Sequence, residues 1–437
     1  MLYGIYLAFC FATPVLGGFL ADKWVGCHRA MIAGAIFLMA GNLLLLLPAL
    51  KFVYLGLAFT ISGTGLYKAN CTSLVGNLYA DHLHKERGLT LFYAGMNLGA
   101  ALAPIFYGII LISLGWQYGF LLNAVGIFIG LILYLFKIKS SELPQENNLF
   151  KNNFLSVISI LFFVLIMTGF SDSAFYYPAA FEYFLGIFGS AIILLILIMA
   201  IKKEKMIRNQ IFAVLLLDLF CVFFFALTLQ IGSSITMFIQ LYINRTFFHW
   251  QIPTIMFSAF DPLFFVLAAP VFAALWSALA KQKREPFIMT KVSLSFILLA
   301  FAFLSFMLAA QTHQEPVSLL WVILGDFFLG AGEICLAAPV LSVISQFMPK
   351  NLQGTMMGVW FLAIAFAGFL SGILAELTDS LNFIHTKAMS LSSFNHVFLA
   401  MVLLAVLLSV ISFAAKPVIK KWLIRQSTSL SPMSHSH

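Results

Sequence analysis

Five ionisable side chains lie inside long apolar runs of the sequence and are the first candidates for chemistry. They are Lys68, Asp218, Asp261, Asp326 and Glu333. A charge at the middle of a bilayer costs roughly 2.5 to 3.5 kcal/mol or more, so intramembrane charges are rare and mark substrate or proton pathways. Asp326 and Glu333 stand two helical turns apart on one helix face. Asp326 therefore either lines the same cavity as Glu333 or rests against a neighbouring hydroxyl.

Lys68, Glu333 and the polar Asn97 share a common depth, roughly 25 Å along their apolar segments at 1.5 Å per residue. We interpret this as a water-filled cavity between two bundles, with a cation on the N-terminal side and an anion on the C-terminal side. The alternative is a Lys68 to Glu333 ion pair that only holds the two sides together. Asp218 is expected to have a local structural role, and Lys291 is expected to extend its ammonium toward water.

The composition shows which elements must position these residues. The chain has 437 residues, of which 62% are apolar and 9% charged, whereas a soluble chain carries about 25% charged residues. It is therefore an integral membrane protein, and nucleic-acid-binding, secreted and ordinary cytosolic enzyme classes are excluded. The five cysteines are scattered singly, and no catalytic constellation, cofactor motif or metal-ligand spacing is present.

Apolar runs predict about thirteen transmembrane helices, because a bilayer core requires about 20 apolar residues per helix. The segments are 1 to 20, 29 to 49, 52 to 79, 86 to 113, 117 to 137, 153 to 171, 180 to 202, 209 to 243, 253 to 281, 286 to 311, 316 to 348, 352 to 378 and 394 to 417. Nearly all Lys and Arg residues fall in alternate loops, so the C-terminus is predicted to be cytoplasmic.

The same pattern divides the chain. Residues 1–137 form an N-terminal bundle, 138–208 a polar linker followed by two extra transmembrane helices, 209–425 a C-terminal bundle, and 426–437 a polar tail that we expect to be disordered. The fold class is all-α and polytopic, with two helical bundles and an inserted helix pair.

Four stretches resemble the proton-dependent oligopeptide transporters of the major facilitator superfamily. GGFLADKWVGCHR (residues 17 to 29) is similar to the cytoplasmic loop of the superfamily, with Gly18, Asp22, Lys23 and Arg29 in place. GTGLYKANCTSLVGNLY and LTLFYAGMNLGA resemble the family's signature pair GxGLFKPN and FYxxINxG. The C-terminal stretches LQIGSS, DPLFFVLAAPVFAALW, GAGEICLAAPVLS and MMGVWFL follow in the family's order.

The resemblance implies roles for individual residues. Glu333 would hold the amino terminus of a peptide, Lys68 its carboxylate, and Asn97 its backbone. Further substrate-binding candidates are Tyr67, Tyr93, Gln230 and Trp360, and the proton-coupling candidates are Asp261, Asp326 and Glu333.

The sequence also departs from the family. It begins in what resembles the family's second helix, so we expect the first helix, with its ExxER motif, to be missing. Leu229 occupies the position of a usual acid, and Asp261 that of a usual Asn. We expect the chain as given to exchange peptides without concentrating them, and Asp261 either replaces the lost acid or reflects drift.

The favoured function is import of di- and tripeptides by a secondary active transporter, proton-coupled in the intact form of the family. It is not an enzyme. The predicted location is a bacterial inner membrane, as a monomer whose partners are small peptides, protons and lipid, with no nucleic acid and no cofactor. The alternatives are a carrier for another small solute, a drug exporter of the same superfamily, and a non-transporting remnant or sensor.

Overall fold

The computed structural model describes residues 2–79, 82–113, 115, 117–138, 153–176, 178–232, 234–247, 250–252, 254–312, 316–382 and 391–423. Most of the predicted linker and the whole predicted tail, 426–437, lie outside these residues. The first half of the chain contains α1 (Leu2–Leu20), the π-helical turn η1 (Ala21–Val25), α2 (Cys27–Leu44), α3 (Leu50–Asn77), α4 (His82–Ser113), α5 (Gln117–Ile138), α6 (Asn153–Tyr176) and α7 (Pro178–Ile201).

The second half contains α8 (Lys205–Thr228), the 3-10 turn η2 (Leu229–Gly232), α9 (Ser234–Tyr242), β1 (Thr246–Phe247), β2 (Trp250–Gln251), the 3-10 turn η3 (Thr254–Ala259), α10 (Phe260–Lys281), α11 (Ile288–Gln311), α12 (Leu320–Phe347), α13 (Lys350–Asn382), α14 (Leu391–Ala414) and α15 (Lys416–Leu423). Strands β1 and β2 pair antiparallel and form the one β-sheet among the described residues.

Each of the thirteen predicted segments overlaps a helix, because backbone polar groups in lipid must be satisfied within the segment itself. Within the described residues, nine helical stretches are long and apolar enough to cross a membrane. The count of thirteen spans stays a prediction. One predicted span, 209 to 243, is interrupted, because the chain leaves α8 for η2 before it enters α9.

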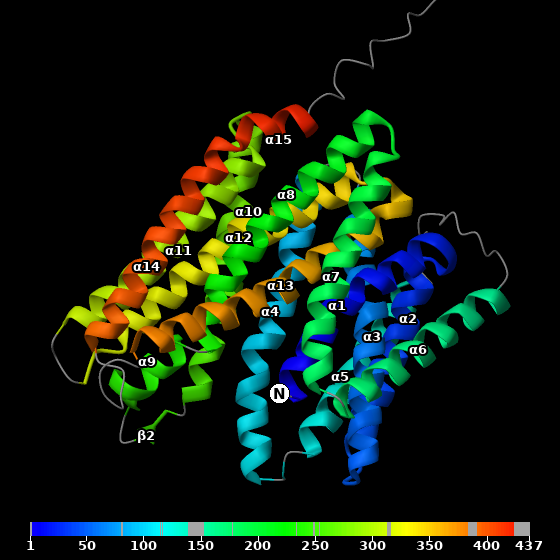
Figure 1. The fold of residues 1–437 in the computed structure, drawn as a ribbon, viewed down its shortest axis with the longest axis horizontal. Helices are drawn as coiled ribbons and strands as arrows, with labels where there is room; N and C mark the ends of the chain where they lie inside the picture. The colour runs from blue at the N-terminus through cyan, green and yellow to red at the C-terminus, as the bar shows by residue number, and fades with distance from the viewer. Residues whose placement is uncertain are drawn as a thin grey trace, which may run out of the picture.

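The helices fall into two groups, which we call the N-terminal half (α1–α5) and the C-terminal half (α8–α14). In the first, α3 packs against α1 and α2, and α2 also contacts α5. In the second, α11 packs against α12 and α14, and α10 against α12. The halves meet where α1 crosses α13 and α4 lies along α10 (Figure 1). The predicted domain boundaries themselves are not tested by these contacts.

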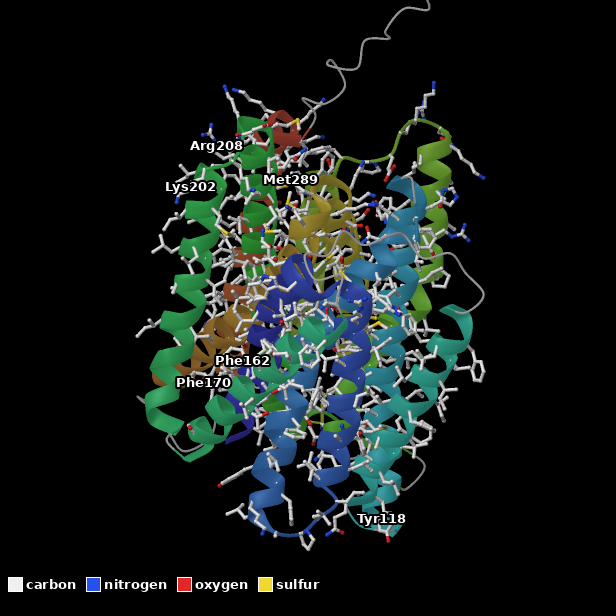
Figure 2. The ribbon with its side chains drawn as sticks, turned by 90° about the vertical axis from the view of Figure 1, so that its right-hand side faces the viewer. Tyr118, Phe162, Phe170, Lys202, Arg208 and Met289 are labelled. Carbon is white, nitrogen blue, oxygen red and sulfur yellow. The ribbon has the colours of Figure 1, made fainter. Side chains whose placement is uncertain are left out.

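One end of the molecule carries the predicted cytoplasmic loops, and we call it the basic end. Lys202 and Arg208 mark it in Figure 2, at the connection from α7 to α8, and Tyr118 of α5 lies at the opposite end. The connection from α10 to α11, residues 282–287, and helix α15 carry further Lys and Arg residues.

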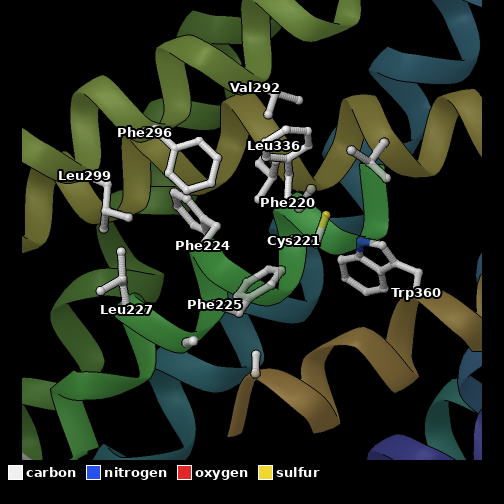
Figure 3. Packing of buried hydrophobic residues seen from close by; sticks show 14 of the residues in the cluster. Phe220, Cys221, Phe224, Phe225, Leu227, Val292, Phe296, Leu299, Leu336 and Trp360 are labelled. Carbon is white, nitrogen blue, oxygen red and sulfur yellow. The ribbon is translucent and has the colours of Figure 1, made fainter. Parts of the chain in front are cut away.

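The C-terminal half has a core rich in phenylalanine. Phe224 of α8 is fully buried and meets Phe225 and Phe296 edge-on, with ring centroids 5.6 and 5.9 Å apart. Phe225 in turn contacts Trp360 of α13 (Figure 3). Edge-to-face rings add to the burial of apolar surface, and this packing fixes α8 and α13 around the residues described next.

Candidate functional site

The centre of the site is a contact between the halves. The Tyr93 hydroxyl of α4 donates a hydrogen bond of 2.8 Å to Oε1 of Glu333 on α12. Both side chains are buried, with 7% and 6% of their surface exposed. The predicted aromatic and the predicted acid are therefore brought together from residues 240 positions apart.

Two further acids lie beside Glu333. Asp261 on α10 is close enough to Glu333 and Asp326 to interact with both electrostatically, and we call these three residues the carboxyl cluster. Gly330 allows this approach, because a Cβ there would lie 2.8 Å from the backbone nitrogen of Phe265 and 2.9 Å from the carbonyl oxygen of Asp261. Oδ1 of Asp261 is buried and has no hydrogen-bond partner among the described residues.

Lys68 lies on the other side of a row of rings. Its ammonium sits 4.0 Å from the ring centroid of Phe11 on α1 and 5.6 Å from that of Phe361 on α13. Phe361 contacts Trp360, and Trp360 contacts Tyr93, at centroid distances of 4.9 and 5.8 Å. We call Phe361, Trp360 and Tyr93 the aromatic row.

The aromatic row separates the cation from the acids. Within the described residues no ion pair joins Lys68 to Glu333, so the alternative of a structural ion pair is not what the structure shows. Cation–π contacts stabilise the Lys68 ammonium instead. The charges at the two ends of the row are opposite in sign, and the row runs across the junction of the two halves.

The remaining predicted substrate residues lie elsewhere. Asn97 is partly exposed, and its amide donates to the carbonyl of Tyr93 one turn earlier, at 3.1 Å. Tyr67 packs against Gly34 of α2 and interacts with Cys71, which turns it into the N-terminal half. Gln230 is fully buried, and its amide donates to Ser371.

The predicted motif loop lies at the basic end, where it joins α1 to α13. Oδ1 of Asp22 accepts a hydrogen bond of 2.9 Å from the amide of Gly354, and Oδ2 accepts bonds of 2.6 Å from the amide and the hydroxyl of Thr355. Asp22 lies in the connection between α1 and α2, outside the predicted spans, and burial raises the pKa of its carboxyl to about 6.

Its neighbours in the motif have separate contacts. Gly18 touches the backbone of Gly354, so that any Cβ there would collide with the carbonyl of Gly354. The guanidinium of Arg29 donates to Ser156 of α6 at 3.1 Å, which ties the extra helix pair to α2. Lys23 lines a cavity at the basic end.

The prediction that Lys291 extends toward water is wrong. Its side chain is 2% exposed and its ammonium lies 2.6 Å from Glu86 of α4 and 2.8 Å from Glu285. The ring of Trp276 is 4.9 Å away. Lys291 lies close to the N-terminal end of α11. Its partner Glu86 comes from the other half of the protein, so the sequence of α11 alone does not reveal the ion pair.

Sequence reasoning also missed Phe11 and Phe361, because a phenylalanine among 48 others carries no signal of its own. Glu86, between Lys85 and Arg87, has the pattern of a solvated loop. The neighbouring Lys85 also contacts the C-terminal half, where its ammonium donates to the carbonyl of Ser345. No group of described residues could hold a metal ion.

The chain is similar to known proteins over most of its length. A family model described as the POT family matches residues 28–391. The peptide transporter YePEPT of Yersinia enterocolitica is 28% identical over 85% of this chain and 78% of its own length. Dipeptide and tripeptide permease A of Yersinia pestis is 25% identical over 95% of this chain and 84% of its own.

A solved structure has the same fold. The crystal structure of a peptide transporter POT in complex with sulfate superposes with a TM-score of 0.70 at 25% identity, covering 96% of this chain and 86% of its own. The predicted family and the predicted all-α, polytopic fold of the major facilitator superfamily are therefore confirmed.

Proposed function

Because the chain belongs to the POT family, we propose that it carries short peptides across a membrane as a secondary active transporter. The observation that supports this best is the pair of opposite charges at the ends of the aromatic row. The carboxyl cluster around Glu333 offers anions on the C-terminal half, and Lys68 offers a cation on the N-terminal half.

A zwitterionic di- or tripeptide matches this arrangement. Its ammonium would bind Glu333, its carboxylate would bind Lys68, and its side chains would lie among the rings of the aromatic row. Charge-assisted hydrogen bonds are stronger than neutral ones and depend on the fixed ends of the ligand. The rings contribute apolar contacts that do not depend on one side-chain shape, so we expect a range of peptides to bind.

The carboxyl cluster also suggests how protons take part. Three acids held near one another repel when they are ionised, and a peptide ammonium entering the cluster relieves that repulsion. Protons also bind to these carboxylates, so the number of protons held by Asp261, Asp326 and Glu333 would change as the halves move. Inward transport with protons would require that one acid of the cluster holds a proton while another binds the ammonium, because strict competition at one carboxylate would exchange a proton for the peptide.

Orientation and location complete the proposal. Loops rich in Lys and Arg face the cytoplasm in membrane proteins, so the basic end and the C-terminus would lie in the cytoplasm of a bacterium, with the chain acting as a monomer in the inner membrane. The N-terminal and C-terminal bundles, 1–137 and 209–425, would rock about the site, with the insert 138–208 beside them.

The test compares peptides that differ at one end. Glu333→Gln should weaken binding of a free dipeptide by about 10- to 100-fold, the equivalent of a charged hydrogen bond worth about 1.5 to 3 kcal/mol, and should change binding of its N-acetylated form far less. Lys68→Ala should show the reverse preference, with C-amidated peptides least affected. Calorimetric binding to the purified protein measures both.

Equal losses for blocked and free peptides would remove the assigned roles. Counterflow of labelled dipeptide in liposomes then separates a transporter from a protein that only binds, and competition by free amines or small anions separates a peptide carrier from a carrier of another solute.

A further inference from the structure

A cavity lies at the basic end, and none of the residues that line it belongs to the aromatic row. It has a volume of about 270 Å³ and lies where η1, α7, α8 and α13 meet. Three of its lining side chains are lysines, Lys23, Lys202 and Lys203, and no acid is among the described residues that line it. Figure 2 shows Lys202 at this end, where α7 approaches the start of α8.

The rest of the cavity wall is apolar. Ile196 and Met199 of α7 and Ile211 of α8 form one side, and Met356 of α13 forms another. Thr355 supplies a polar atom, but its hydroxyl already donates to Asp22. Asp22, next to Lys23 in the chain, accepts hydrogen bonds from the backbone of α13 and does not serve as a counterion to Lys202 and Lys203.

Three lysines line one small cavity, and a bound anion would offset their positive charge. Lysine is a common phosphate ligand as a point charge, and basic cavities between transmembrane helices at the cytoplasmic side bind lipid headgroups. The apolar wall favours a lipid over a soluble anion, because a small soluble ion gains no apolar contacts from it.

The surface next to the cavity continues this pattern. On α7 the side chain of Leu195, directly before the cavity-lining Ile196, is 59% exposed, so it faces the lipid chains of the bilayer. A headgroup in the cavity would have its acyl chains beside this residue. We propose that this cavity binds the phosphodiester headgroup of an anionic phospholipid from the leaflet at the basic end.

The position of the site gives the lipid a structural effect. η1 and α13 belong to opposite halves and meet through Asp22 and Thr355 directly beside the cavity. A headgroup bound to Lys23 of η1 and to Lys202 and Lys203, in the connection from α7 to α8, would hold η1 and the end of α7 against α13. The lipid therefore stabilises the arrangement in which the basic end is closed.

The experiment uses the purified full chain and two matched double variants. Lys202→Gln with Lys203→Gln removes two lysines of the cavity. Lys420→Gln with Lys421→Gln removes an adjacent, exposed pair of lysines on α15 that does not line the cavity. Native mass spectrometry measures retention of phosphatidylglycerol, and phosphatidylcholine serves as the neutral lipid.

We expect the unchanged chain to bind phosphatidylglycerol in preference to phosphatidylcholine. Two lysines at about 1 kcal/mol each predict binding about 30-fold weaker in the Lys202, Lys203 variant, and little change in the Lys420, Lys421 variant. Thermal unfolding should shift upward with phosphatidylglycerol in the same order of variants.

Two results would overturn the proposal. Equal loss in both double variants would mean that only total charge matters, and the cavity has no special role. Equal thermal stabilisation of the chain by inorganic phosphate alone would assign the cavity to a soluble anion. The substituted lysines belong neither to the carboxyl cluster nor to the aromatic row. Failure of this proposal therefore leaves the proposed peptide site unaffected.

Discussion

Removal of the charge on Glu86 should open the basic end. Lys291 of α11 is buried between Glu86 of the other half, at 2.6 Å, and Glu285 of its own half, at 2.8 Å. Glu86→Gln removes the ion pair that crosses between the halves, whereas Glu285→Gln removes one that does not. A hydrogen bond between charged groups contributes about 1.5 to 3 kcal/mol. A loss of about 2 kcal/mol changes the ratio of open to closed molecules about 30-fold.

Spin labels at two exposed positions of the basic end report the opening. Leu78 follows α3 and Gln282 follows α10, so a label pair at these positions spans the two halves. Double electron–electron resonance in liposomes should show a longer-distance population that grows in Glu86→Gln and stays small in Glu285→Gln. The native cysteines are replaced first.

The comparison of the two variants decides the matter. If Glu86→Gln and Glu285→Gln give the same distance distribution, the pair from Lys291 to Glu86 does not hold the halves together. A double variant, Lys291→Met with Glu86→Leu, should restore the closed population, because an apolar replacement of a buried pair removes the unpaired charge. Continued opening in the double variant would point to lost packing instead.

Other parts of the structure make three further predictions. Burial raises the pKa of Asp22 to about 6, so the folded protein holds this proton more tightly than the unfolded chain does. Stability should therefore rise as the pH falls from 7 toward 4, and Asp22→Asn should flatten the curve of Tm against pH. An unchanged curve in the variant would contradict this. Gly18→Val should lower the Tm because its side chain collides with Gly354, while Gly99→Val, with nothing within 4 Å of a Cβ, should not; equal shifts would refute the packing argument. Asp218→Leu should raise the free energy of unfolding by about 1 to 3 kcal/mol, since neither carboxylate oxygen of Asp218 has a hydrogen-bond partner among the described residues. Chemical denaturation of both proteins in detergent measures this difference, and a lower free energy of unfolding in the variant would refute the prediction.

The sequence predicted the helices well because hydrophobic length is a direct demand of the bilayer. The run 286 to 311 corresponds to α11, Ile288–Gln311. Depth in the membrane also grouped Glu333 with Lys68 and Asn97, and the family resemblance added Tyr93, which donates a hydrogen bond to Glu333. Depth, however, says nothing about which way a side chain points around its helix.

This explains the failures. Tyr67 is adjacent in sequence to Lys68 but faces Gly34 of α2, since neighbouring residues differ by about 100° around a helix. Lys291 was mistaken for a surface residue because its partner Glu86 is 205 positions away. Such pairings depend on how the two halves dock, which one sequence does not encode in any local pattern.

The aromatic row has a consequence for the speed of ligand entry. Rings change rotamer in picoseconds to nanoseconds when they have room, whereas whole bundles move in microseconds to milliseconds. The three rings of the row have no such room, because Phe361, Trp360 and Tyr93 are buried, with 3%, 0% and 7% of their surface exposed. Entry of a ligand between Lys68 and Glu333 would then wait for the slower motion of α4 and α13, so binding would be no faster than the movement of the helices.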